Sequence, residues 1–195
     1  MNRLAQLGLA LAFAAPAALA QQAAPATPTA VAAPAAPAAA GMPAARAADV
    51  ASIDAIIAAL YDVISGPAGA PRDWDRMRSL FASEGRMGVV GARPDGSFAL
   101  RTMTPDDYIA RSSKTFATQG FFETEKARTL EVFGQIAHVF STYEARHAKD
   151  DAKPFMRGIN SIQLIHDGKR WYVLSLIWRA EDAKLQLPER YLRNG

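Results

Sequence analysis

The sequence predicts an α+β domain in which three helices pack on one face of a curved, mainly antiparallel sheet of about six strands. Two observations predict it. Apolar residues recur at helical spacing in the early part of the domain, around residues 53–64, 74–81 and 105–118. From residue 121 onward the pattern is almost entirely one of strands joined by short polar loops. Helices followed by a meander of strands are typical of the α+β class.

The N-terminal part of the chain differs from the rest. Residues 1–20 contain Arg3, then an apolar run to about Ala15, then Ala-Leu-Ala, which is the pattern of a secretory signal peptide. The run is too short for a spanning helix with proper flanks, although an uncleaved membrane anchor is the alternative. Residues 21–49 are dominated by alanine and proline and are predicted to be a disordered linker. We therefore expect a periplasmic or secreted protein with no membrane span after signal removal.

Composition excludes several kinds of site. The chain has no cysteine, which excludes disulfides, thiol nucleophiles, thiolate zinc sites, iron–sulfur ligation and attachment of a lipid through cysteine. The formal net charge is only +3, and basic residues alternate with acidic ones, so nucleic acid is not an expected partner. The three histidines have no metal-ligand spacing, and neither a G-x-S-x-G nor a phosphate-loop motif occurs. We expect no metal and no cofactor.

Each predicted helix has its own signals. The first carries apolar side chains at helical spacing: Ile53, Ile56, Ile57, Leu60 and Ile64. The Gly-Pro pair at 66–67 ends it. Asp73 is the predicted N-cap of a short second helix that ends by Gly85. Thr104, followed by a proline and two acidic residues, begins a third helix that runs to about residue 118.

The strands form three predicted hairpins. Segments 86–93 and 97–102 flank a Pro-Asp-Gly turn, and segments 121–132 and 135–147 should pair antiparallel. The last hairpin, 157–178, turns at Asp-Gly. The alternating charges of the segment ETEKAR, starting at Glu123, are typical of a solvated strand face. The folded domain is predicted over residues 50–182, followed by a C-terminal tail at 183–195.

Strand alternation limits which polar side chains can meet. On the strand within 135–147, His138 and Tyr143 have opposite parity, so at most one of them lines a pocket. In the last hairpin, a loop of two or four residues places Asn160 and Trp178 on opposite faces, whereas a three-residue loop with a bulge exchanges the partners. The segment YVLSLIW is apolar on both faces, so we expect helices on one side and a homodimer partner on the other.

The order of these elements resembles the nuclear transport factor 2-like superfamily, in its SnoaL-like bacterial branch. The segments that carry the resemblance are IAALYDVISGP, DWDRMRSLF, GQIAHVFSTYEAR and DGKRWYVLSLIW. The resemblance implies a cone-shaped half-barrel whose helices and concave sheet enclose one pocket, commonly with dimerisation through the sheet. The superfamily contains isomerases, dehydratases, cyclases and many members that only bind, so the fold by itself implies no activity.

Enzymes that resemble this fold use a carboxylate or histidine as base and a tyrosine or protonated acid to stabilise the oxyanion. The pocket candidates in this sequence are Trp74, Tyr108, His138, Tyr143, Asn160 and Trp178. We favour an exported soluble domain that binds a small, mostly apolar molecule of unknown identity, without assigned catalysis. One alternative is an acid–base enzyme of isomerase, dehydratase or cyclase type, with His138 or Asp62 as base and Tyr108 as hydrogen-bond donor. Another is a dimeric protein-interaction module.

Overall fold

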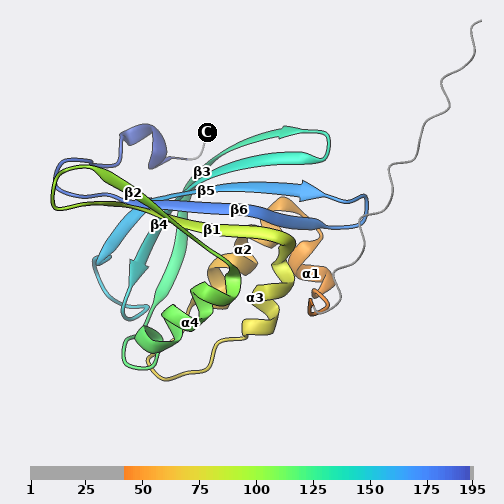
Figure 1. Cartoon of the computed structure of the whole chain (residues 1–195), viewed down its shortest axis with the longest axis horizontal. Coiled ribbons are helices and arrows are strands. Elements are labelled where there is room, and N and C mark those ends of the chain that lie inside the picture. Colours follow the sequence, from red (N-terminus) through yellow and green to blue (C-terminus); the bar gives the residue numbers. More distant parts are fainter. Residues whose placement is uncertain (1–41, 194–195) are drawn as a thin grey trace, which may run out of the picture. The chain divides into compact units, whose positions relative to one another are not determined.

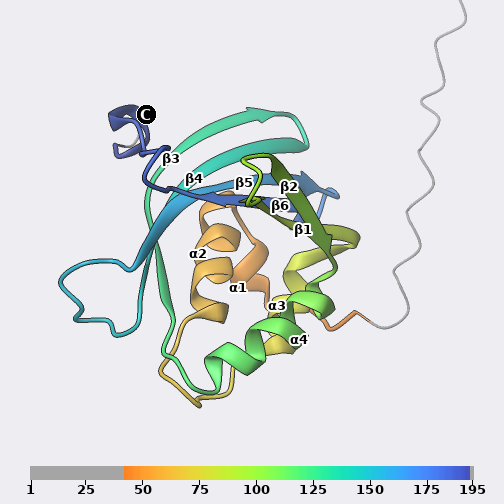
Figure 2. The ribbon, with the colours of Figure 1, turned by 60° about the vertical axis from the view of Figure 1, so that its left-hand side comes forward.

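A computed structural model describes residues 42–193, so the predicted signal peptide and most of the predicted linker lie outside the described residues. The helices are α1 (Ala47–Val50), α2 (Ile53–Ile64), α3 (Trp74–Leu80) and α4 (Pro105–Phe116). They lie on one side of a single curved sheet that bends around α2 (Figures 1 and 2). Within the described residues, no helix is both long and apolar enough to cross a membrane.

The sheet has six strands. They are β1 (Phe81–Ala92), β2 (Phe98–Met103), β3 (Phe122–Phe133), β4 (Ile136–Arg146), β5 (Met156–His166) and β6 (Trp171–Ala180). Their order across the sheet is β2-β1-β6-β5-β4-β3, and the β1–β6 pair is the parallel one. The α+β class and the curved, mainly antiparallel sheet predicted from the sequence are therefore confirmed.

The core lies between α2 and the concave face of the sheet. The buried side of α2 presents Ile56 and Ile57, which have no exposed surface, to strands that bury Val139, Ile162 and Val173. Burial of this apolar surface is the main favourable contribution to folding, at about 25 cal/mol per Å² removed from water. The apolar spacing of the first predicted helix therefore identified the face that packs on the sheet.

Helix α4 begins where the sequence predicted. The Thr104 side chain accepts a hydrogen bond from the Asp107 backbone N–H at 3.1 Å, and the Asp107 carboxylate accepts from the Thr104 N–H at 3.0 Å. This reciprocal capping box, with Pro105 at the first helical position, fixes the start of the helix. Helix α4 crosses the open side of the sheet, as Figure 2 shows, and thereby supplies a wall of the cavity described below.

The second predicted helix is α3, which ends at Leu80, within the limit at Gly85 that the sequence predicted. Strand β1 begins at Phe81. Phe81 is buried and pairs with Val173 of β6, so sheet pairing outweighs local helical preference at this point. The chain then turns so tightly that a Cβ on Gly85 would lie 2.8 Å from the Ala82 carbonyl oxygen.

The predicted register of the last hairpin was wrong. The strands join through residues 167–170, and Leu164 pairs with Val173, as an even loop requires. A bulge at Leu174 then shifts the register, so that Asn160 pairs directly with Trp178. The two side chains therefore share a face of the sheet instead of lying on opposite faces, because an extra residue on one strand reverses the alternation beyond it.

The interpretation of ETEKAR as a solvated face was also wrong. Glu125 pairs with Tyr143 on the concave side of the sheet, and Glu123 lies two residues earlier on the same side. A bulge at Lys126 then brings Arg128 to this side as well, where it pairs with Ser141. Alternation in the sequence shows which residues share a face of the sheet. It does not show that helix α2 packs over the face that carries these charged residues.

The predicted tail contacts the outer, convex face of the sheet. A short 3₁₀-helix, η1 (Glu189–Tyr191), lies over β4, where the Thr142 hydroxyl donates to the Tyr191 carbonyl at 2.5 Å. The Tyr191 ring packs on Phe140 with centroids 5.1 Å apart. Other apolar side chains of this face remain exposed, among them Leu100 at 54% and Ile177 at 37%.

Candidate functional site

A cavity of about 280 Å³ lies between α2, α4 and the concave face of the sheet. Its walls are mainly apolar and aromatic, with contributions from Leu60, Met87, Phe116, Ile162, Leu176 and Trp178. The lining residues that are exposed to solvent are Thr115, Gln119, His147 and Phe155, which belong to the C-terminal end of α4, the segment after it and the β4–β5 loop. The cavity therefore opens to solvent at this end.

Aromatic contacts hold the open end together. The His147 ring stacks on Phe155 with centroids 4.0 Å apart and an interplanar angle of 4°. The Nδ1 atom of His147 lies 3.1 Å from the Gly120 carbonyl oxygen, which joins the β4–β5 loop to the segment between α4 and β3. A Cβ on Gly120 would lie 2.1 Å from the His147 carbonyl oxygen, so only glycine permits this close approach.

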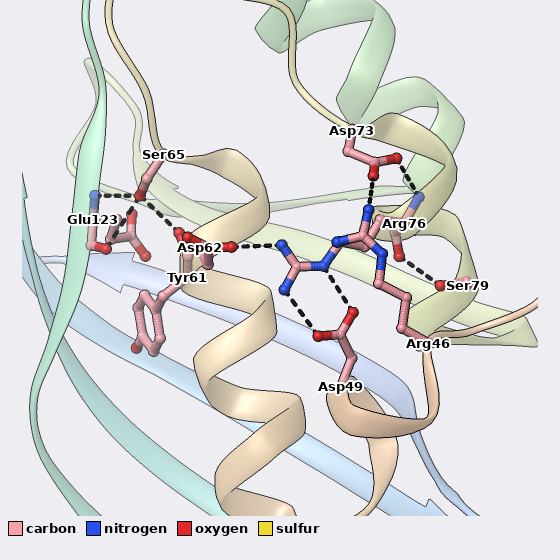
Figure 3. A network of polar contacts seen from close by, with 9 residues as sticks. All are labelled: Arg46, Asp49, Tyr61, Asp62, Ser65, Asp73, Arg76, Ser79 and Glu123. Carbon is pink, nitrogen blue, oxygen red and sulfur yellow. Dashed lines mark hydrogen bonds and ion pairs between the residues drawn. The ribbon is translucent and has the colours of Figure 1, made fainter.

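The cavity wall also carries an ionisable side chain, Glu123 of β3, whose backbone is clamped to the end of α2. The Glu123 N–H donates to the Ser65 hydroxyl at 3.0 Å, and Ser65 in turn donates to the Tyr61 carbonyl at 2.7 Å (Figure 3). Gly66 and Phe121 exchange backbone hydrogen bonds of 2.7 and 3.0 Å immediately beside this clamp. Helix α2 therefore determines where the Glu123 side chain enters the cavity.

Among the described residues, the Glu123 carboxyl group has one hydrogen-bond donor. Its Oε1 accepts from the Asn160 side-chain amide at 3.2 Å, and among the described residues no cation forms an ion pair with it. Burial raises the pKa of Glu123 to about 7, because water that would stabilise the carboxylate is excluded and no positive charge replaces it. Near neutral pH this group is therefore present in both protonated and ionised forms.

A chain of hydrogen bonds leads from Glu123 through the core. Asn160, only 6% exposed, donates its second amide N–H to the Tyr61 hydroxyl at 3.2 Å. The Tyr61 hydroxyl lies 2.7 Å from Ser141 Oγ, and Ser141 donates to the Glu125 carboxylate at 2.6 Å. Burial raises the pKa of Tyr61, so its hydroxyl keeps its proton.

Two further tyrosines line the cavity, Tyr108 of α4 and Tyr143 of β4. Tyr143 is 1% exposed, and its hydroxyl is the one buried side-chain polar atom of the described region that has no hydrogen-bond partner. Burial raises the pKa of both tyrosines, and the nearby Glu123 raises it further. Both are therefore neutral hydroxyls, able to donate a hydrogen bond to an oxygen atom.

A buried cation supports the wall formed by α4. Arg72 donates hydrogen bonds to the carbonyl oxygens of Ile64, Gly66, Pro67 and Ala70, at 2.6 to 3.2 Å. Its guanidinium lies over the Phe116 ring, 5.0 Å from the centroid. The loop after α2 and the end of α4 are therefore fixed to each other behind the cavity wall.

Four of the six residues proposed from the sequence line the cavity, namely Tyr108, Tyr143, Asn160 and Trp178. Trp74 does not, because it stacks on Phe116 from outside the lining, with centroids 6.2 Å apart. His138 lies on the convex face, where its Nε2 is 3.1 Å from Ser161 Oγ. The structure therefore does not bring Trp74 or His138 to the cavity.

The two bases considered from the sequence are not positioned to act with Tyr108. His138 and the cavity lie on opposite faces of the sheet. Asp62 does not line the cavity, and its carboxylate, 70% exposed, binds Arg76 at 2.5 Å (Figure 3). The carboxyl group that lines the cavity with Tyr108 is that of Glu123, which the sequence interpretation placed on a solvated face.

A second, outer hollow of about 590 Å³ lies on the other side of Glu123. Tyr61 and Glu123 line both spaces, whereas Asp62, Glu125, Arg128, Arg146 and Lys149 line the outer one. Tyr61 and Glu123 thus form part of the partition between an apolar cavity and a charged hollow. In the described part of the chain, no group of three or more His, Cys, Asp or Glu side chains is arranged to hold a metal ion.

No protein-family model and no curated protein matches the chain. Among solved structures, a protein of unknown function with a cystatin-like fold from Nostoc punctiforme is similar, with a TM-score of 0.51 and 12% identity over 67% of this chain and 90% of that one. A protein of the NTF2-like family from Streptomyces avermitilis, suggested to be a dehydratase, has a TM-score of 0.50 and 14% identity over 69% of this chain and 97% of that one.

At these identities the similarity is one of fold. The chain has the fold of nuclear transport factor 2-like proteins, as the order of its elements predicted.

Proposed function

We propose that this protein binds a small, largely apolar molecule that carries a carbonyl or hydroxyl oxygen, with this oxygen at the Glu123 end of the cavity. The observation that carries the proposal is a contrast: Glu123 and Tyr143 line a cavity with mainly apolar walls, yet among the described residues the Glu123 carboxyl group has no cationic partner and the Tyr143 hydroxyl has no hydrogen-bond partner. A buried polar group left unpaired costs about 1–3 kcal/mol, which an oxygen of the ligand would offset.

Size and protonation both support this ligand class. A volume of about 280 Å³ is near the lower end for ligand pockets, which span roughly 300–1,000 Å³, so a compact molecule fits best. Neutral Glu123 and the tyrosines donate hydrogen bonds to a carbonyl oxygen, and ionised Glu123 accepts one from a hydroxyl group. Apolar walls supply the rest of the binding free energy through burial of the ligand.

A matched pair of ligands tests the proposal. We expect 1-indanone, a ketone, to bind more tightly than indane, its hydrocarbon counterpart, by about tenfold, which corresponds to one hydrogen bond. NMR shift perturbation of the cavity residues measures both affinities. Tyr143→Phe should reduce the preference for the ketone, whereas the control Glu131→Gln, on β3 and outside the cavity, should keep it. Equal binding of the two compounds, or no shift of cavity residues with either, would refute the proposal.

A second candidate function is acid–base catalysis on such a ligand, and the raised pKa of Glu123 favours it. A carboxylate whose pKa is about 7 is suited to remove a proton beside a carbonyl group, while a neutral tyrosine donates to the oxygen that gains negative charge. In this candidate, Glu123 takes the place that the sequence interpretation gave to His138 or Asp62, and Tyr108 or Tyr143 acts as donor.

Proton exchange at the ketone tests this candidate. In D₂O, the protein should accelerate exchange of the protons beside the indanone carbonyl, and Glu123→Gln should reduce the rate at least tenfold because the amide is not basic. Measuring 1-indanone binding to Glu123→Gln distinguishes lost catalysis from lost binding. Exchange at the uncatalysed rate, or equal exchange by wild type and variant, would rule out catalysis by Glu123.

We also propose that two copies associate through the convex face of the sheet. Phe98, Leu100 and Ile177 lie on this face and are exposed, which is unfavourable for an isolated chain in water. Light scattering should show a dimer that Leu100→Lys dissociates, and a monomeric wild type would contradict the proposal.

Export to the periplasm or medium remains a prediction from residues 1–20, which cell fractionation and N-terminal sequencing of the mature protein would test.

A further inference from the structure

The hydrogen-bond chain that ends at Glu123 has its other end at Glu125, in the outer hollow. The Glu125 Oε2 atom accepts from Arg128 Nε at 3.0 Å and from Arg128 Nη2 at 2.6 Å. Arg128 also contacts Asp54 at 2.7 Å. A carboxylate paired in this way with a guanidinium group is ionised, and an ionised carboxylate only accepts hydrogen bonds.

Counting protons gives the direction of each bond in the chain. Ser141 has one hydroxyl proton, and it donates this proton to Glu125 at 2.6 Å. Ser141 Oγ must therefore accept in its 2.7 Å contact with Tyr61, so the Tyr61 hydroxyl is the donor there. The side-chain nitrogen of Asn160 carries two hydrogens and can only donate, so the Tyr61 oxygen accepts in its 3.2 Å contact with Asn160.

The direction of these hydrogen bonds limits the number of donors that reach the Glu123 carboxyl group. Tyr61 lines the same cavity and hollow as Glu123, but its only proton points toward Ser141 and away from Glu123. In the part of the chain that the structure describes, the single donor to the Glu123 carboxyl is therefore the Asn160 amide. One neutral donor stabilises a carboxylate much less than the two or three that lower the pKa of buried carboxylates in other proteins.

We propose that Glu125 is a positioning residue for Glu123: held by Arg128, it fixes the direction of the hydrogen-bond chain so that Tyr61 donates away from Glu123. A group in the outer hollow thus controls how readily the carboxyl group in the cavity keeps its proton. This inference deepens the proposed function. It rests on that function only in assuming that the Glu123 carboxyl group forms a hydrogen bond with a ligand.

Other charged and titratable groups face Glu123 from both spaces. Tyr108, Tyr143 and His147 line the cavity with it, and Asp62, Arg128, Arg146 and Lys149 line the outer hollow. The three cations have other contacts: Arg128 with Glu125, Arg146 with Glu144 at 2.8 Å, and Lys149 with the Phe122 ring at 5.7 Å from its centroid. Removing the charge of Glu125 would itself favour ionisation of Glu123, so a decisive variant must leave all charges in place.

Ser141→Ala is that variant. It removes the acceptor of the Tyr61 proton without changing any charge, so the Tyr61 hydroxyl becomes free to turn toward Glu123. A hydrogen bond to a charged group contributes about 1.5–3 kcal/mol, so we expect the pKa of Glu123 to fall by about one to two. The measurement is the side-chain carboxyl ¹³C shift of Glu123 as a function of pH, without ligand.

Tyr61→Phe supplies the matched comparison. In the intact chain Tyr61 gives no proton to Glu123, so this variant alone should leave the pKa of Glu123 within about 0.3 of wild type, and combined with Ser141→Ala it should cancel the fall. A higher pKa of Glu123 in Tyr61→Phe would show that Tyr61 donates to Glu123, and an unchanged pKa in Ser141→Ala would show that the chain does not control it. Either result overturns the proposal.

Glu125→Gln, compared with the double variant Glu125→Gln/Tyr61→Phe, provides a second route if Ser141→Ala does not fold. The glutamine can donate to Ser141, which reverses the chain, and both variants lack the Glu125 charge, so the pKa of Glu123 should be lower in the single variant because only there can Tyr61 donate to Glu123. Equal pKa values of Glu123 in the two variants would show that the chain does not control it. Because no ligand is present, failure here is distinguishable from failure of the ketone-binding test.

Discussion

Helix α2 has a polar network on each side, and the two networks treat carboxylates in opposite ways. On the side facing α3, Arg76 binds Asp49 through two bonds of 2.7 and 2.9 Å and binds Asp62 at 2.5 Å (Figure 3). On the side facing the sheet, Glu123 has one amide donor and no cationic partner within residues 42–193. The first network links α1, α2 and α3, whereas the second leaves a carboxyl group available to a ligand.

The pKa directions express the same contrast. The hydrogen bond from Arg76 holds the pKa of Asp49 below its ordinary value of 3.8, whereas burial raises the pKa of Glu123 from 4.5 to about 7. A paired carboxylate stabilises the fold in its ionised form, and an unpaired buried one destabilises the fold when it ionises. The two networks therefore make the stability of the protein depend on pH with opposite signs.

The largest effect should come from breaking the paired network. Arg76→Met leaves the Asp49 carboxylate, whose side chain is 12% exposed, without its partner, so we expect a loss of about 3–5 kcal/mol in the free energy of unfolding. Urea denaturation measures it. The control Asp62→Asn removes a carboxylate that is 70% exposed and should cost less than about 1 kcal/mol. Equal losses in the two variants would show that Asp49 is not the principal partner.

The pH dependence of stability should separate the two networks. Below pH 4.5 Glu123 is protonated in both the folded and the unfolded chain, so it opposes folding only as the pH rises from 4.5 to about 7, by up to about 3 kcal/mol. Glu123→Gln should remove this loss. Asp49 acts in the other direction, since its contribution is present above pH 3.8 and disappears as the pH falls through its lower folded pKa.

Thermal unfolding of both proteins from pH 3 to 8 checks this prediction. Wild-type stability that stays level or increases between pH 4.5 and 7, relative to Glu123→Gln, would mean that ionised Glu123 is stabilised in the fold.

The smallest effect should come from Tyr143. Its buried hydroxyl has no partner among the described residues, so Tyr143→Phe should increase the free energy of unfolding by about 1 kcal/mol at most. Tyr61→Phe removes a hydroxyl that both donates and accepts, and should cost about 1–2 kcal/mol. Chemical denaturation of the two variants gives the comparison directly, and a larger loss for Tyr143→Phe would reveal a partner of its hydroxyl.

Much of the fold could be predicted because its signals are local. The Thr104 cap and proline start α4, the apolar spacing of α2 marks its buried face, and glycine-containing turns separate the strands. Alternation also separated His138 from Tyr143 correctly, since both lie on β4, which is regular between them. These features depend on residues a few positions apart, whose geometry the backbone determines.

The candidate site could be predicted only in part. Tyr108, Tyr143, Asn160 and Trp178 were identified as unusual polar or aromatic residues within apolar elements, but Glu123 was missed. Acidic residues alternating with basic ones have the same pattern on a solvated face and on a covered one. The two bulges, at Lys126 and Leu174, had no decisive sequence signal, and each reverses the face of every residue beyond it.

The sequence by itself determined the elements, their order and the pairs of residues that share a face, because backbone periodicity and turn chemistry act over short distances. Only the tertiary structure decided which face α2 and α4 cover, that Asn160 and Trp178 lie side by side, and that Glu123 has no cation. Those outcomes depend on burial and pairing between segments far apart in the chain, such as Tyr61 with Asn160, 99 residues away. The pKa of Glu123 is therefore a property of the folded assembly of helix and sheet.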